Sequence, residues 1–282
     1  MDVRDLSGKA VVVTGAGSGI GRATALLAAE RHATLYLCDV NEPGLAQTAI
    51  AARNLGATAH TSRVDVADPD AMRAFAEVVH ADVPAVDVLI NNAGVGLGAS
   101  FTDTTLEDWH WIVGINLLGP IHGCHFFLPR MIERRRGGHI VNVASMAGFI
   151  PSEGTTAYGT TKFGVVGLSE YLRVEVMRHH IGVTAICPGV INTPIVRSAR
   201  TRGIYDVPRF HAWMGATFQR RNYSPERVAK AIFRALQRDR GVAPVSPEAW
   251  AFYLLKRASP ALTYKISTWV AARLRRNLSL EG

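Results

Sequence analysis

Cysteine is scarce in this chain: three residues, Cys38, Cys124 and Cys187, stand far apart among 282. An odd number at long spacings argues against a disulfide framework, and no pair has the spacing of metal ligands. We therefore expect reduced thiols, no bound metal and a cytoplasmic location.

Long apolar runs are missing from both ends of the sequence. Residues 1–5 mix charges and lack the apolar segment of a signal peptide. Near the C-terminus the longest apolar run is 249–255, far short of the roughly 20 residues that a membrane-spanning helix needs. The sequence therefore predicts neither a secretory leader nor a C-terminal anchor.

Acidic residues are outnumbered, with 23 Asp and Glu against 31 Lys and Arg, for a formal net charge of +8. Residues 248–282 hold six of the basic residues and two glutamates, and so carry half of this excess. The basic residues elsewhere do not gather beside aromatic residues, as a nucleic-acid-binding surface would require. We therefore expect no nucleic-acid partner.

Short apolar runs alternate with stretches of helical spacing along most of the sequence. We expect strands at 10–14, 34–39, 86–91, 140–144 and 183–187 and helices at 21–31, 43–55, 70–80, 106–135 and 156–179. Strands separated by helices pair in parallel through right-handed crossovers, so the pattern predicts an α/β fold with one doubly wound, parallel Rossmann sheet and helices on both faces. No linker divides the chain. We expect one domain over 1–247 and a helical extension over 248–282.

A glycine-rich turn, TGAGSGIG, follows the first expected strand and opens the first expected helix. Glycine lets backbone N–H groups approach a pyrophosphate there, and the helix N-terminus adds partial positive charge. A glycine pattern alone can mark any tight turn, but this one has the strand before it and the helix after it that a dinucleotide site requires. The residues expected to contact the dinucleotide are Gly15, Gly17, Ser18, Gly19, Ile20 and Gly21.

Three further segments are expected at the same edge of the sheet, where the strands end. Asp39 ends the second strand, where its carboxylate would accept hydrogen bonds from ribose hydroxyls and repel a 2′-phosphate. The sequence thus favours NAD over NADP, although Arg22 could alter that preference and Asp39 could instead only cap the next helix. The other residues expected at this edge are Asp65, Val66, Asn92, Ala93 and Gly94.

A YxxxK pair, Tyr158 and Lys162, lies in a long expected helix, thirteen residues after Ser145. With the glycine turn, an NNAG strand end and the helix asparagine Asn116, the sequence resembles the short-chain dehydrogenase/reductase family over about 6–236. The resemblance implies that Asn116, Ser145, Tyr158 and Lys162 are catalytic. It also implies that the nicotinamide half of the coenzyme is contacted by Tyr158, Lys162, Pro188, Gly189, Ile191 and Thr193.

The spacing of Tyr158 and Lys162 predicts their joint chemistry. Residues i and i+4 share one helix face, with Cβ atoms about 5–6 Å apart. A free phenol with a pKa of about 10 is too weak an acid at neutral pH, and an ammonium about 4 Å away would lower that pKa by up to about three units. We expect Tyr158 to exchange a proton with the substrate oxygen while Ser145 hydrogen-bonds that oxygen. The resemblance implies that Lys162 also holds the nicotinamide ribose and relays protons through water near Asn116.

The resemblance places a variable lid at about 190–224, which is rich in large apolar side chains: Ile195, Tyr205, Phe210, Trp213, Met214 and Phe218. They favour a lipophilic substrate, or they only anchor the lid to the core. Arg197, Arg200 and Arg202 are expected to be solvated, a phosphate or carboxylate on the substrate being the alternative.

These features predict an NAD(H)-dependent oxidoreductase that interconverts a secondary alcohol and a ketone, assembled by resemblance as a homodimer or homotetramer. An NADPH-dependent 3-oxoacyl reductase is the alternative within this class. A dinucleotide-sensing binding protein is the alternative outside it, but such a protein would not need Ser145, Tyr158 and Lys162.

Apolar residues recur at helical spacing over 248–282, and Pro260 divides them into two segments. We favour a helix pair that packs on the enzyme or across a subunit interface with its basic face in water. The alternative is an amphipathic element on anionic lipid, which would hold the protein peripherally at the inner face of a membrane.

Overall fold

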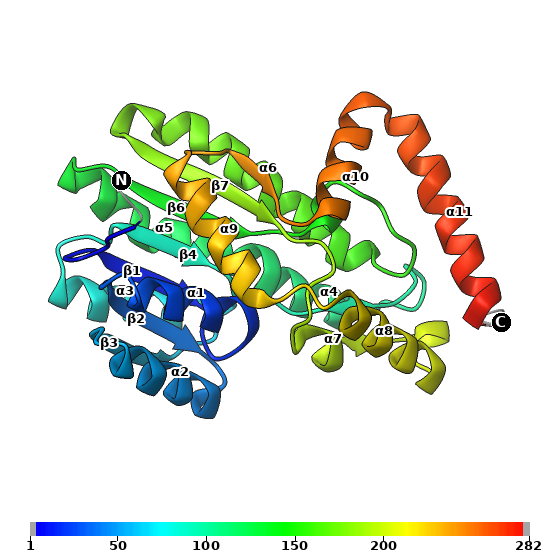
Figure 1. Cartoon of the computed structure of the whole chain (residues 1–282), viewed down its shortest axis with the longest axis horizontal. Coiled ribbons are helices and arrows are strands. Elements are labelled where there is room, and N and C mark those ends of the chain that lie inside the picture. Colours follow the sequence, from blue (N-terminus) through cyan, green and yellow to red (C-terminus); the bar gives the residue numbers. More distant parts are fainter. Residues whose placement is uncertain (1–3, 279–282) are drawn as a thin grey trace.

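A seven-stranded parallel sheet forms the centre of the computed structural model, which describes residues 4–278 (Figure 1). Its strands, in spatial order, are β3 (Ala59–Arg63), β2 (Thr34–Asp39), β1 (Ala10–Thr14), β4 (Val88–Asn91), β6 (Gly138–Val143), β7 (Ile181–Cys187) and β9 (Val242–Pro244). The strand order reverses between β1 and β4, the position at which doubly wound sheets bind ligands. The expected Rossmann fold is confirmed.

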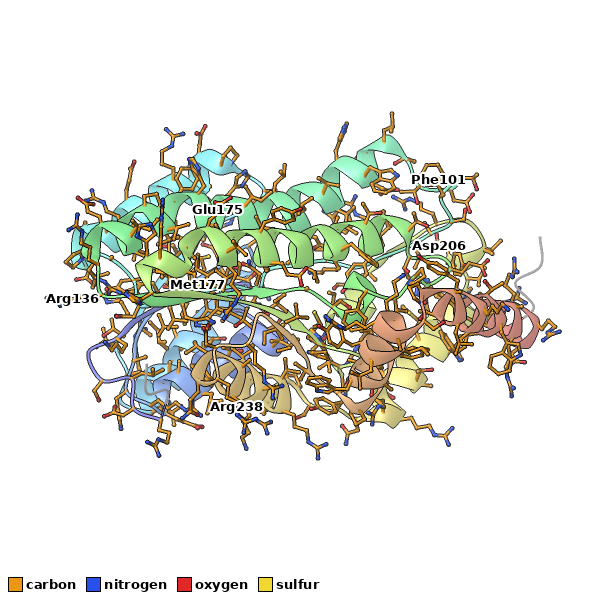
Figure 2. All side chains as sticks on the ribbon, turned by 90° about the horizontal axis from the view of Figure 1, so that it is seen from above. Phe101, Arg136, Glu175, Met177, Asp206 and Arg238 are labelled. Atoms are coloured by element: carbon orange, nitrogen blue, oxygen red, sulfur yellow. The ribbon has the colours of Figure 1, made fainter. Side chains whose placement is uncertain are left out.

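Two layers of helices cover the sheet, as the view from above shows (Figure 2). One layer contains α1 (Gly19–Ala29), α2 (Glu42–Asn54) and α9 (Pro225–Gln237), and the other contains α3 (Pro69–Asp82), α5 (Gly119–Arg134) and α6 (Thr156–Val176). Val11 and Val13 of β1 pack with the first layer and Val12 with the second, and all three are fully buried. Burial on both faces explains why residues 10–13 of this strand are all apolar.

The helix expected at 106–135 is interrupted in its middle. It consists of α4 (Leu106–Val113), a π-helical turn η1 (Gly114–Leu118) and α5. Pro120 has no N–H to donate to the carbonyl of Asn116, so the regular hydrogen-bond ladder is broken at this point. The interruption places Asn116 at a turn that differs from the helix on either side.

The stretch 106–134 is also long and apolar enough to span a membrane, with a mean hydropathy of 1.3 over 18 residues. In this fold Phe127 and Met131 of α5 are fully buried against strands β4 and β6. Burial of this kind is typical of an apolar core helix in a globular domain.

Several elements beyond the expected ones shape the end of the molecule at which α7, α8, α10 and α11 gather (Figure 1). The lid contains α7 (Ile195–Ser198), β8 (Arg200–Thr201), η4 (Gly203–Tyr205) and α8 (Pro208–Arg221). Strand β8 pairs in parallel with β5 (Leu97–Gly98), which follows the NNAG segment. Strands of two or three residues, such as β5, β8 and β9, are too short for apolar periodicity to reveal them.

The C-terminal extension forms two helices, α10 (Pro247–Ala258) and α11 (Pro260–Leu278). Residues 279–282, like 1–3, lie outside the described part. The ring of Tyr253 contacts that of Phe149, and Arg275 forms an ion pair with Glu153 at 3.3 Å. One face of the extension therefore packs against the segment that follows Ser145.

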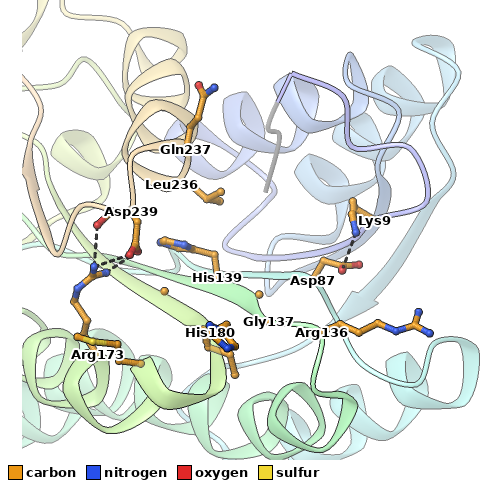
Figure 3. A pocket seen from close by; sticks show the side chains of 14 residues that line it. Lys9, Asp87, Arg136, Gly137, His139, Arg173, His180, Leu236, Gln237 and Asp239 are labelled. Atoms are coloured by element: carbon orange, nitrogen blue, oxygen red, sulfur yellow. Dashed lines mark hydrogen bonds and ion pairs between the residues drawn. The ribbon is translucent and has the colours of Figure 1, made fainter.

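A hollow of about 590 Å³ lies at the amino-terminal ends of the strands, the edge opposite to the glycine turn (Figure 3). Lys9 forms an ion pair with Asp87 at 3.5 Å, and Arg173 forms one with Asp239 at 2.7 Å. These charged groups pair with one another. The hollow also lies at the edge of the sheet opposite to the one at which such folds bind dinucleotides.

Candidate active site

The turn between β1 and α1 is packed too tightly to accept side chains at two of its glycines. Gly15 has φ of +65°, and a Cβ there would lie 2.7 Å from Cα of Ala93. A Cβ at Gly21 would lie 2.1 Å from the carbonyl oxygen of Gly15. Ser18 precedes α1 without capping it through its side chain, so the N–H donors of the first helical turn lack a side-chain acceptor. The backbone of this turn fits an anionic group such as a pyrophosphate.

Hydrogen bonds tie the end of β4 to the glycine turn. The N–H groups of Asn92 and Ala93 both donate to Oγ1 of Thr14 at 3.0 Å. Nδ2 of Asn92 donates to the carbonyl oxygens of Thr14 and Gly15 at 2.9 and 3.1 Å. The structure therefore brings the NNAG segment to the turn, with Asn92 acting through its side chain as part of the turn's framework.

Asp39 approaches the same turn from the end of β2. One carboxylate oxygen accepts the N–H of Gly17 at 2.8 Å and the other accepts the N–H of Asn41 at 2.9 Å. The cap of α2 is Asn41, whose side chain accepts the N–H of Gly44. The alternative that Asp39 only caps this helix is therefore wrong: Asp39 lies at the glycine turn and fixes it.

Asp65 and Val66 follow β3 at the same edge, but they differ in what they offer. The Asp65 side chain is exposed and accepts the N–H of Ala67 at 2.9 Å. Val66 is buried in the core, and its carbonyl lies 2.9 Å from Nδ1 of His122. A coenzyme at this edge would meet the carboxylate of Asp65 and only the backbone of Val66.

The four residues expected to be catalytic meet at the carboxyl end of β6. Ser145 follows the strand, Tyr158 and Lys162 lie on α6, and Asn116 lies in η1. A Cβ at Gly94 would lie 3.2 Å from Oδ1 of Asn116 and 3.4 Å from Nζ of Lys162, so these two groups flank the NNAG backbone. Nζ of Lys162 also donates to the carbonyl oxygen of residue 143 at 3.0 Å, two residues before Ser145.

Asn116 is fully buried and bonds across the site rather than to its own helix. Its Oδ1 accepts the N–H of Val95 at 2.8 Å, and its Nδ2 donates to the Val95 carbonyl at 2.9 Å. The alternative of an asparagine that bonds its own helix is wrong. The paired bonds fix the segment after NNAG, and they depend on the π-helical turn that carries Asn116.

Burial is the largest influence on the pKa values of both Tyr158 and Lys162. Burial raises the pKa of Tyr158, and a hydrogen bond with Ser145 opposes this without offsetting it. Burial also lowers the pKa of Lys162 to about 8. The ammonium lies 5.8 Å from the centre of the Tyr158 ring and donates to a carbonyl instead. The expectation that Lys162 lowers the pKa of Tyr158 is therefore wrong for the chain alone, and the phenol is protonated at neutral pH.

The loop after β7 joins the serine end of the site to the glycine turn. The Pro188 carbonyl accepts the N–H of Met146, next to the serine, at 2.8 Å. A Cβ at Gly19 would lie 3.4 Å from the Thr193 side chain, and one at Gly189 would lie 2.4 Å from Oγ of Ser246. Ile191 is buried in the core, so a coenzyme in the crevice would meet its backbone rather than its side chain.

Within the lid, some apolar residues serve the lid itself. Tyr205 and Phe210 are buried in a small cluster with Met214, while Trp213 is 38% exposed. Phe149 and Ile150, after the catalytic serine, pack in a cluster that includes Ala249 of α10. Much of the apolar content near the site therefore holds the lid and the extension in place.

The arginines of the lid are not all solvated. Arg197 is exposed, but Arg200 and Arg202 both bind the carboxylate of Asp108, a residue of α4 that sequence reasoning missed. In sequence, Asp108 stands three residues after Thr105 and is typical of a helix-capping pair; Thr105 does accept its N–H at 3.1 Å. No local signal distinguishes that role from the ion pair.

Known proteins are similar to this chain in both sequence and fold. Residues 9–203 match the family described as short chain dehydrogenase. The chain is 40% identical over 257 residues to "Probable oxidoreductase EphD" of Mycobacterium tuberculosis, covering 89% of this chain and 43% of that protein. It is 38% identical over 254 residues to "Putative oxidoreductase SadH" of the same organism, covering 89% and 90% of the two chains. The chain thus spans less than half the length of the first of these relatives.

Among solved structures, a short chain dehydrogenase/reductase from Burkholderia phymatum in complex with NAD superposes with a TM-score of 0.82. The two are 31% identical, and the match covers 92% of this chain and 96% of that one. The sheet order, the glycine turn and the Ser145–Tyr158–Lys162 arrangement agree with this similarity. The chain therefore belongs to the short-chain dehydrogenase/reductase family.

Proposed function

We propose that the protein interconverts a secondary alcohol and a ketone with NAD(H) as coenzyme. The observation that carries the proposal is the meeting of Ser145, Tyr158, Lys162 and Asn116 beside a turn whose backbone fits a pyrophosphate. A bound nicotinamide would supply or accept the hydride. Tyr158 would donate or accept the proton at the substrate oxygen, which Ser145 would hold by a hydrogen bond.

A substrate panel tests this function. We expect turnover of lipophilic secondary alcohols with NAD and of the matching ketones with NADH. The partly exposed Trp213 and the apolar lid support a lipophilic substrate. Preference for small polyols would contradict that substrate class. Reduction of 3-oxoacyl thioesters with NADPH would favour the 3-oxoacyl reductase alternative, and coenzyme binding without any turnover would favour a dinucleotide sensor.

Preference for NAD over NADP is expected to depend on the charge of Asp39. Asp39→Asn keeps an acceptor for the N–H of Gly17 but removes the charge that would repel a 2′-phosphate. The ratio of kcat/KM for NADP to that for NAD should rise about 10- to 100-fold, as expected for losing a partly solvated repulsion. Steady-state kinetics with both coenzymes measures this ratio.

Two further variants make the Asp39 experiment decisive. Glu77→Gln removes an exposed charge from α3 and should leave the ratio unchanged. Asp39→Ala also removes the acceptor for Gly17 and should weaken both coenzymes in addition. An unchanged ratio in Asp39→Asn would show that another residue sets the preference.

A homodimer or homotetramer of cytoplasmic location is part of the proposal. Along α6, Phe163, Tyr171 and Val174 follow helical spacing and are 42%, 80% and 73% exposed. Such a stripe of large apolar side chains is typical of a surface that is covered by another subunit. Molar mass by light scattering tests the assembly.

We also propose that the outward face of α11 contacts anionic lipid. Residues 249–278 contain six Lys or Arg and no Asp or Glu, and Leu262 and Trp269 are 46% and 57% exposed. This combination is typical of interfacial helices.

The full chain should sediment with vesicles that contain phosphatidylserine and not with phosphatidylcholine alone. Lys265→Gln combined with Arg273→Gln should weaken binding about 30-fold, at about 1 kcal/mol per basic residue. Absence of sedimentation with either vesicle would reject lipid contact.

A further inference from the structure

The carboxylate of Asp108 is a buried anchor for residues 200–202 of the lid, at β8 and just before η4. Its side chain is 1% exposed. Oδ2 accepts Nε of Arg202 at 2.9 Å, and Oδ1 accepts Nη2 of Arg202 at 3.0 Å and Nη1 of Arg200 at 3.4 Å. Burial alone would raise the pKa of Asp108, but the arginines outweigh it and hold that pKa below its usual range. Asp108 is therefore charged at neutral pH and is paired with two cations of the lid.

Backbone and ring contacts hold the same residues of the lid. The N–H of Arg200 donates to Gly96 at 3.1 Å, and the N–H of Arg202 donates to Gly98 at 3.0 Å. The guanidinium of Arg200 lies 3.7 Å from the centre of the Trp111 ring. The lid strand is thereby attached to the segment directly after NNAG and to α4.

The carboxylate of Glu248 is an anchor for the lid at Arg221, the end of α8. Its Oε2 accepts Nη2 of Arg221, the last residue of α8, at 2.5 Å. Its Oε1 accepts the N–H of Val190, in the loop after β7, at 3.1 Å. Burial would raise the pKa of Glu248, and these hydrogen bonds outweigh it. Glu248 belongs to the first turn of α10, so the C-terminal extension supplies this anchor.

We propose that Asp108 and Glu248 are positioning residues that fix the two ends of lid residues 200–221 and thereby set the shape of the substrate side of the site. Neither residue belongs to the lid, and the part between the anchors carries its own small core of Tyr205 and Phe210. Residues 203–220 are therefore held at Arg202 by Asp108 and at Arg221 by Glu248. The expected change in substrate KM rests on the proposed function. The expected loss of order in the lid does not depend on it.

The two anchors differ in what else they hold, which gives each a distinct kinetic signature. Asp108 contacts the two lid arginines and Thr105, the cap of its own helix, whereas Glu248 contacts Arg221 and also Val190, beside the residues implied to contact nicotinamide. Asp108→Asn should raise KM for the alcohol or ketone about 10- to 100-fold, the loss expected for a charge-assisted hydrogen bond, with coenzyme KM unchanged. Glu248→Gln should raise both KM values.

Hydrogen exchange followed by mass spectrometry tests the anchors without relying on turnover. In Asp108→Asn, amide exchange should rise about 10-fold or more within residues 200–206 and stay unchanged in β1 and β4. In Glu248→Gln, amide exchange should increase at the end of α8 and in residues 189–193. Glu133→Gln, which removes an exposed ion pair with Arg130, should change neither region.

A second route keeps the proposal testable if Asp108→Asn does not fold. Arg202 is 42% exposed in its side chain, and Arg202→Gln should produce the same local exchange and the same rise in substrate KM. Combining Arg202→Gln with Asp108→Asn should add little to either single change, because both remove one interaction. Strict additivity of the two changes would overturn the pairing.

Three results would overturn the proposal. One is unchanged lid exchange in both anchor variants, and another is a uniform rise across the whole sheet, which would indicate general destabilisation. The third is lid-local exchange accompanied by unchanged substrate KM in an active enzyme. Lid-local exchange in a protein that turns over no alcohol or ketone would instead refute the proposed function and leave the anchors in place.

Discussion

Tyr158→Phe is expected to lower kcat by about 100- to 10,000-fold, the range that a positioned acid–base group contributes. The ring of Tyr158 packs in a cluster with Ile112 and Ala157, and Phe keeps this packing while removing the proton that the reaction needs. Coenzyme binding should survive, because the glycine turn and Asp39 are untouched. Steady-state kinetics together with titration of NADH fluorescence measures both properties.

A matched control separates this effect from the general loss of a hydroxyl group. Tyr171 is on the same helix and is 80% exposed, so Tyr171→Phe should leave kcat and coenzyme binding unchanged. A Tyr158→Phe enzyme with near wild-type kcat would eliminate Tyr158 as the acid–base. Loss of coenzyme binding in the same variant would show that its main role is to bind the coenzyme.

The glycine turn and its packing against the NNAG segment could be predicted because their signal is local. A glycine turn between a β-branched strand and a helix has one geometry, and the NNAG segment meets it because parallel strands end at the same edge. Thr14 and Asn92 show the same principle in detail, since both lie at strand ends and bond to each other. At the carboxyl ends of the strands, the sequence motifs and the parallel sheet therefore predict the same contacts.

The acidity of Tyr158 could not be predicted from spacing. The i,i+4 relation places Lys162 on the same helix face, but the direction of its ammonium depends on a carbonyl of β6. The burial that raises the pKa of Tyr158 depends on packing by α4 and the segment after β4. Desolvation is a property of the assembled fold, and a Coulomb estimate from sequence omits it.

The ion pairs of the lid arginines could not be predicted either, because their partner is far away in the sequence. Asp108 lies 92 and 94 residues before Arg200 and Arg202, and the pairing exists because β5 and β8 join the two segments. Those strands have two residues each and leave no periodic signal. Glu248 is similar, since its role appears only when α10 folds back onto the loop after β7. Long-range contacts through short elements decide what these charged residues do.

Lys162→Met is expected to lower activity by about 100-fold or more and at the same time leave stability equal or higher. Lys162 is 4% exposed, and its pKa falls from 10.5 to about 8 on burial. That difference corresponds to a cost of about 3 kcal/mol for keeping the amine charged in the fold. Met has a similar length, removes this cost and leaves the carbonyl of residue 143 without its donor, which costs about 1–3 kcal/mol. The net change at pH 7 should therefore be a gain of about 0–2 kcal/mol.

The pH dependence of this gain identifies its cause. The cost of the charged amine is fully present below pH 8, where both the folded and the unfolded chain are protonated at Lys162. Between pH 8 and 10.5 the unfolded chain binds more protons than the folded one, so the wild-type protein loses this cost as pH rises. Urea unfolding of both proteins at pH 7 and pH 10 should show the advantage of Lys162→Met shrinking by about 2–3 kcal/mol. An advantage that is independent of pH would show that packing, rather than the buried charge, distinguishes the two proteins. A variant with full activity would show that the ammonium is needed neither for the proton relay nor for the coenzyme.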